Sequence, residues 1–206
     1  MRMVLFAALF AFAASALPAR SAVLMPPETG YSATRIVKTG GNEIAGKVYS
    51  QGRNERWEMS VQGTRQVSIL QHDAGRAFLY MPDMNMAMTM NTADAKKYGV
   101  SEVFTGIEAE EAGTEIVDGE ETTRYRIPPT PKNGNTETMV WITDDGIPVK
   151  AEGEGSQGTF SMVLKDLKRA PQDASLFRLP DGVTPMTMPA GLPGMMQGGL
   201  PAMPLR

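Results

Sequence analysis

Apolar and polar residues alternate with a period of two along most of this chain. In the segment 55–61, Trp57, Met59 and Val61 fall on one face of an extended chain, and polar side chains fall on the other. Turn-forming sequences separate such segments at intervals of roughly eight to twelve residues. The pattern predicts about nine or ten antiparallel strands rather than alternating strands and helices. Clear examples are 31–39, 43–50, 55–61, 65–71, 76–81, 122–127, 136–143, 147–153 and 159–167.

The stretch 92–111 departs from this pattern. Thr92 is suited to cap a helix that begins near Ala93. Further on, Val103, Phe104 and Ile107 recur at helical spacing. The sequence therefore predicts one or two short helices here, within a fold that is mainly β (α+β).

Methionine occupies every second position from residue 84 to residue 90. In a strand, such residues project from one face. Their thioethers are apolar, flexible and polarizable, so they adapt to irregular partners and suit soft metal ions. Three interpretations are open: an ordinary core, a cavity for an apolar ligand, and a Cu(I) site.

Each of the two functional interpretations predicts its own set of residues. A cavity on the inner wall of an incomplete barrel would place Trp57 and Met59 opposite the methionines, with aromatic residues of the strand 76–81 nearby. The predicted cavity residues are Trp57, Met59, Phe78, Tyr80, Met84, Met86, Met88 and Met90. The alternative Cu(I) ligands are Met84, Met86, Met88, Met90 and His72.

The chain offers little for catalysis. It contains no cysteine and a single histidine, His72, which is next to the turn residues Asp73 and Gly75. Cysteine chemistry is thereby excluded, and zinc or non-haem iron usually requires two or three His or Cys ligands. The acidic pairs along the chain fall in turns or at helix ends. We predict that the protein is not an enzyme and that it needs no cofactor.

The N-terminus has the features of a secretory signal peptide. Arg2 precedes the apolar run 4–14, which is too short to span a bilayer. Small residues allow cleavage after Ala16 or Ala22. Removal of 1–22 takes away two arginines and no acid, so the formal charge changes from −3 to −5. We predict a soluble periplasmic protein with no nucleic-acid partner and no integral membrane segment.

The composition changes again near the C-terminus. Between residues 181 and 206, methionine, glycine and proline each occur five times. Such a segment cannot offset its ordering entropy by packing. We therefore expect a signal peptide at 1–22, a single domain at 23–182 and a disordered Met/Pro/Gly-rich tail at 183–206.

Four segments in this order resemble the lipoprotein-localisation factor superfamily (LolA-like and LolB-like), within an uncharacterised exported branch. The segments are 75–82 (GRAFLYMP), 113–119 (GTEIVDG) followed by 123–125 (TRY), 140–150 (VWITDDGIPVK) and 174–182 (ASLFRLPDG). The resemblance implies a strongly curved antiparallel sheet that forms an unclosed half-barrel, with short helices plugging its concave face. It also implies an inner cavity for acyl chains.

Taken together, these observations predict a protein that binds a lipid or a lipidated protein in an apolar cavity. Its role would be in handling lipids or lipoproteins in the cell envelope. A periplasmic Cu(I)-binding protein is one alternative. The other is a non-catalytic adaptor that binds another envelope protein.

Overall fold

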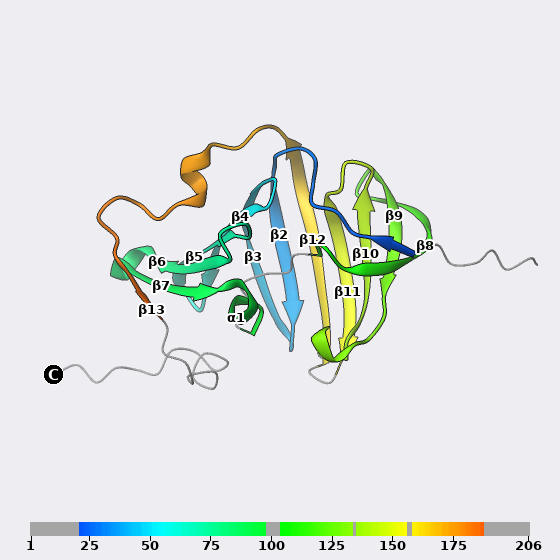
Figure 1. Ribbon diagram of the computed structural model, residues 1–206, viewed down its shortest axis with the longest axis horizontal. Coiled ribbons are helices and arrows are strands. Elements are labelled where there is room, and N and C mark those ends of the chain that lie inside the picture. Colours follow the sequence, from blue (N-terminus) through cyan, green and yellow to red (C-terminus); the bar gives the residue numbers. More distant parts are fainter. Residues whose placement is uncertain (1–20, 98–103, 134, 156–157, 188–206) are drawn as a thin grey trace, which may run out of the picture.

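The computed structural model describes residues 21–97, 104–133, 135–155 and 158–187. Within these ranges, thirteen strands form one curved sheet that does not close into a barrel (Figure 1). The strand order is β1-β8-β9-β10-β11-β12-β2-β3-β4-β5-β6-β7-β13. Every neighbouring pair is antiparallel except β7 and β13, which are parallel. The strands are β1 (Ser21–Val23), β2 (Tyr31–Thr39), β3 (Asn42–Gln51), β4 (Asn54–Val61), β5 (Thr64–Gln71), β6 (Arg76–Met81), β7 (Met86–Asn91), β8 (Glu108–Val117), β9 (Glu120–Ile127), β10 (Glu137–Thr143), β11 (Pro148–Gly155), β12 (Gly158–Arg169) and β13 (Pro185–Thr187).

The described residues include few helices. They are α1 (Thr92–Lys97) and three 3-10 turns, η1 (Pro82–Met84), η2 (Pro131–Asn133) and η3 (Ala174–Phe177). The mainly β fold is thus confirmed, and α1 begins at Thr92, one residue before the predicted start near Ala93. Residues 98–103 of the predicted helical stretch, which include Val103, lie outside the described residues.

The second predicted helix is wrong for residues 104–107. This segment is a turn, and β8 already begins at Glu108. The backbone of Leu24 bonds to Ile107 and to Gly106, whose φ of 72° is left-handed. Backbone pairing with Leu24 of the N-terminal segment holds these residues in a turn, so the helical spacing of Phe104 and Ile107 does not indicate a helix.

Cross-strand register divides the side chains of the sheet between two faces. One row of paired residues runs through Ala33, Val48, Trp57, Ser68 and on to β7. These residues point to the inner, concave side, where α1 and the segment 24–30 lie in Figure 1. The main core forms on this side and includes Leu24 and Phe104 packed against the sheet.

The outer side of the sheet is covered at one end by the chain after β12. There η3 packs Phe177 against the sheet. The buried residues of this outer-face cluster are Val67, Ile69, Phe78, Tyr80, Ala87 and Phe177. The Arg56 guanidinium and the Gln71 amide also donate hydrogen bonds to backbone carbonyls of η3.

The predicted start of the disordered tail, residue 183, is too early. Residues 183–187 are ordered: Val183 packs against the outer-face cluster, and β13 pairs with Ala87, Met88 and Thr89 of β7. An unpaired edge of β7 offers free backbone hydrogen-bonding groups, and β13 satisfies part of them. Residues 188–206 lie outside the described residues.

Candidate functional site

Three of the four alternating methionines share the inner face. Met86, Met88 and Met90 occupy alternate positions of β7. Met84 does not join them, so the prediction of four is wrong. It ends η1, and Asn85 follows it with a left-handed φ of 47°. The strand starts after this reversal, which leaves the Met84 side chain 48% exposed.

Two further members of the predicted cavity lie on the opposite face. Trp57 is paired with Ser68, and Ser68 with Leu79, so these three point inward. Phe78 and Tyr80 alternate with Leu79 along β6 and therefore point outward. They belong to the outer-face cluster with Phe177. The prediction that Phe78 and Tyr80 lie near the wall formed by Trp57 is wrong.

Trp57 and Met59 do lie on the inner face. Trp57 is only 6% exposed, and Met59 packs against the same core. The guanidinium carbon of Arg35 lies 5.5 Å from the centroid of the Trp57 ring, a cation–π distance. The indole nitrogen of Trp57 has no hydrogen-bond partner among the described residues.

Arg35 and Glu55 form a buried ion pair beside Trp57. Two hydrogen bonds of 2.8 and 2.6 Å join the guanidinium to the carboxylate. The side chains are 3% and 11% exposed. Such a pair is stable only while both partners are present, since either charge alone would be buried and uncompensated. The inner face thus has a polar centre within its apolar surface.

Tyr31 adjoins this pair and is almost completely buried. Burial, followed by the nearby Glu55 carboxylate, raises the pKa of Tyr31 to about 12. Both effects disfavour the phenolate. The Tyr31 hydroxyl therefore stays protonated at neutral pH and serves as a neutral hydrogen-bonding group.

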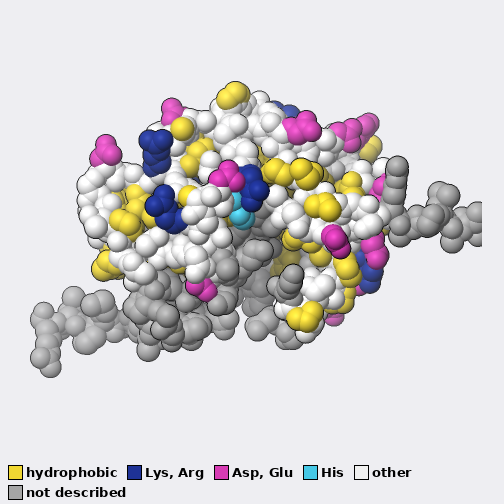
Figure 2. All heavy atoms as spheres, viewed as in Figure 1, with side chains coloured by type: hydrophobic (Ala, Val, Ile, Leu, Met, Phe, Trp, Pro, Cys, Tyr) yellow, Lys and Arg dark blue, Asp and Glu magenta, His cyan; other side chains and the backbone are white. Residues whose placement is uncertain are grey.

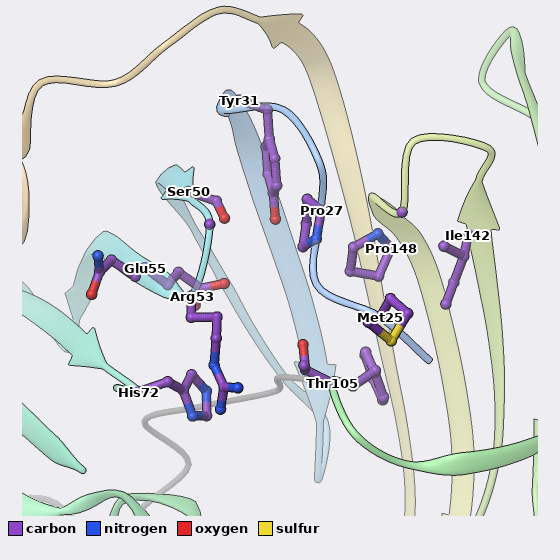
Figure 3. A pocket seen from close by; sticks show the side chains of 14 residues that line it. Met25, Pro27, Tyr31, Ser50, Arg53, Glu55, His72, Thr105, Ile142 and Pro148 are labelled. Atoms are coloured by element: carbon purple, nitrogen blue, oxygen red, sulfur yellow. The ribbon is translucent and has the colours of Figure 1, made fainter. Parts of the chain in front are cut away.

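A pocket opens on the inner side next to this polar centre (Figure 3). Tyr31, Ser50 and Glu55 stand on one side, and Met25, Pro27 and Pro148 stand across from them. The pocket contains about 470 Å³ of empty space, including the part that is open to solvent. The space available to the centres of water molecules is about 40 Å³. The lining residues are Met25, Pro27, Tyr31, Ser50, Gly52, Arg53, Asn54, Glu55, His72, Phe104, Thr105, Ile142, Gly146 and Pro148.

None of the eight predicted cavity residues lines this pocket. Sequence reasoning missed its apolar wall because that wall combines loop residues with strand ends. Met25 and Pro27 precede β2, whereas Phe104 and Thr105 precede β8. A usable signal was the cluster of apolar residues at 23–27, directly after the candidate cleavage sites.

His72 lines the pocket, with Arg53 beside it in Figure 3. The Arg53 side chain also forms an ion pair of 3.1 Å with Asp73. Figure 2, drawn from the same side as Figure 1, shows the histidine at the surface beside basic and acidic side chains. Charged groups thus mark the polar rim of the pocket.

The predicted Cu(I) set cannot form one site. His72 precedes β6 and Met84 follows it, and six strand residues span roughly 17 Å. Within the described ranges, no three His, Asp or Glu residues are grouped so that they could hold a metal ion. None of the helices described there is long and apolar enough to cross a membrane.

Comparison by sequence finds neither a matching protein-family model nor a matching curated protein. Comparison by structure does find similar folds. An uncharacterized conserved protein from Thermus thermophilus has a TM-score of 0.56 at 13% identity, covering 78% of this chain and 91% of that one. MucB has a TM-score of 0.51 at 13% identity, covering 77% of this chain and 60% of its own.

A third neighbour is the Mycobacterium tuberculosis lipoprotein LppX, with a TM-score of 0.39 at 17% identity, covering 69% of this chain and 88% of that one. That score is too low to support an argument. The TM-scores of the first two show a shared fold, and at 13% identity they show nothing more. The class defined in this way is an open, curved, antiparallel β sheet, and the chain spans about three fifths of MucB.

Proposed function

We propose that this protein is exported to the periplasm and binds a lipid or acyl chain, without catalysis, on the inner face of its half-barrel. The observation that supports the proposal is the pocket beside the Arg35–Glu55 pair. One wall is apolar, the other is polar, and the opening faces solvent. An amphiphilic ligand matches such a pocket, because its apolar chain can contact the apolar wall while its polar headgroup contacts the polar wall.

The proposed ligand needs more space than the pocket now has. A space of about 40 Å³ for water centres suits a few water molecules rather than an acyl chain. The proposal therefore includes a displacement of the segment 24–30, which covers the inner face. Each buried methylene contributes about 0.8 kcal/mol, so six of them contribute about 5 kcal/mol toward that displacement and toward binding.

Several of the predicted cavity residues fit this proposal. Trp57, Met59, Met86, Met88 and Met90 lie on the inner face, where they extend the apolar surface away from the pocket. A ligand longer than the pocket would follow this surface. We propose that the chain of the ligand contacts them after it enters beside Met25.

The first experiment asks what the protein carries. The protein is purified from the periplasm without detergent, extracted with organic solvent and analysed by mass spectrometry. We expect an acyl lipid at a constant ratio to protein, and binding of a fluorescent fatty acid after delipidation. An empty preparation that also fails to bind the fatty acid would contradict the proposal.

A pair of variants locates the binding site. Met25 lines the pocket and is 69% exposed, whereas Val23 is 55% exposed and does not line it. Because both side chains face solvent, a charge at either position should leave the fold intact. Met25→Glu should weaken fatty-acid binding at least ten-fold, and Val23→Glu should change it less than two-fold. Equal effects would place the ligand elsewhere.

An adaptor role is the competing proposal. The solved structures that resemble this chain include MucB in complex with MucA. An adaptor would carry no lipid and would instead retain a protein partner on an affinity column. The extraction experiment separates the two roles, because only the first predicts a bound acyl lipid.

A further inference from the structure

Methionines from three strands meet on the inner face where β6, β7 and β13 lie side by side. Met81 of β6 is paired with Met86, and Met186 of β13 is paired with Met88. Residues paired across strands share a face, so Met186 projects to the same side as the methionines of β7. Met90 completes the group two positions beyond Met88.

These five side chains differ in accessibility. Met81 and Met90 are buried, with 1% and 8% exposure. Met86 and Met88 are half-buried, and Met186 is 54% exposed. The accessible group of Met86, Met88 and Met186 is called the thioether triad below. It combines an apolar surface with three sulfur atoms that solutes can reach.

Backbone spacing brings the triad within reach of a single ion. Neighbouring strands lie about 4.8 Å apart, and alternate residues of one strand lie about 6.7 Å apart. The flexible methionine side chains can span half of either distance. More than half of the Met186 side chain is exposed in its strand, so its sulfur is open to an ion from solvent.

We propose that the thioether triad binds one soft monovalent cation, Cu(I), between β7 and β13. Thioethers favour Cu(I) over harder ions, and three sulfur ligands suffice for it. This site replaces the predicted set that included Met84 and His72. The triad residues do not line the pocket beside Arg35 and Glu55. Met86 and Met88 do belong to the surface proposed to contact the ligand chain, so Cu(I) binding is measured on delipidated protein.

Binding at the triad would also connect two strands. β13 has three residues, and among the described strands it is paired with β7 alone. An ion held by Met88 and Met186 cross-links β13 to β7. Cu(I) should therefore slow hydrogen exchange at the backbone amides of β13, which an ion bound elsewhere would not do.

The test measures Cu(I) transfer from a chromogenic chelator under anaerobic conditions to the chain that lacks the predicted signal peptide and with it Met1 and Met3. Four methionines that follow β13 in the sequence could also bind Cu(I), so the measurements use a background in which they are replaced by Leu. These are Met188, Met195, Met196 and Met203. In this background we expect one Cu(I) per chain and at least ten-fold slower amide exchange at Met186 and Thr187.

Leucine substitutions identify the ligands, because they nearly preserve volume and apolarity. Met88→Leu and Met186→Leu should each weaken Cu(I) binding at least ten-fold and abolish the change in exchange. Met139→Leu, a half-buried methionine on β10, is the matched control and should bind as the background does. Met186 is exposed, so its variant should fold. Binding that survives both triad substitutions, or no competition with the chelator, would overturn the proposal.

Discussion

Tyr31 shows how a single residue on the inner face couples stability to pH. Its pKa is raised from 10 to about 12, first by burial and then by Glu55. The folded state therefore favours the protonated phenol. The corresponding stabilisation is complete below pH 10 and is lost as the pH rises toward 12. Over two pKa units it amounts to about 3 kcal/mol.

Replacement of Tyr31 by Phe tests this coupling. The free energy of unfolding in urea is measured between pH 9 and pH 12 for both proteins. The wild type should lose about 2 kcal/mol more than Tyr31→Phe over this range, because the Tyr31 phenol of the unfolded chain ionises above pH 10 while its pKa of about 12 keeps the buried phenol protonated. Groups common to both proteins cancel in the difference. Parallel profiles would show that Tyr31 does not carry the effect.

The residue scale also shows where sequence reasoning fails. Alternation correctly put Trp57 and Met59 on one face of β4, and Phe78 and Tyr80 on one face of β6. Alternation alone cannot show whether those two faces lie on the same side of the sheet. A shift of one residue in strand pairing moves every side chain of a strand to the opposite face. Here Trp57 is paired with Ser68 and Ser68 with Leu79, so Phe78 points outward.

At the scale of elements, long strands with clear alternation were predictable. The bounds of β2 (Tyr31–Thr39) and β6 (Arg76–Met81) agree with the prediction residue for residue. β1 and β13 were missed. Each has three residues, too few for a period, and each is paired with a strand more than 80 residues away in the sequence. Their stability comes from tertiary pairing, which local patterns do not encode.

β1 distinguishes between the two cleavage sites of the predicted signal peptide. Its residues Ser21 and Ala22 are paired with Glu110 and Ala109 of β8. Cleavage after Ala22 would remove two of the three residues of this strand, whereas cleavage after Ala16 leaves it whole. We therefore predict a mature chain that starts at Leu17. The intact mass of protein secreted to the periplasm measures this directly, and a chain that starts at Val23 would contradict it.

At the scale of the whole molecule, the sheet places the two tryptophans on opposite faces. Trp57 points to the inner side, next to Arg35. Trp141 is paired with Lys150, and the register of their strands places both side chains on the outer side. The Lys150 amine lies 4.1 Å from the centroid of the Trp141 ring. Its indole nitrogen donates a hydrogen bond of 2.7 Å to Glu115. The fluorescence of Trp57 therefore reports on the inner side of the sheet, and that of Trp141 reports on the outer side.

This arrangement gives the inner-face proposal an optical test. A fatty acid that enters the inner side should change the emission of Trp57 and leave that of Trp141 unchanged. Trp141→Phe should therefore keep the full ligand-dependent change in fluorescence, and Trp57→Phe should lose it while an acyl-lipid assay still detects binding. Phe keeps most of the apolar surface at position 57, so the fold and the apolar wall persist. A signal that follows Trp141 would place the ligand on the outer side, where η3 packs against the sheet.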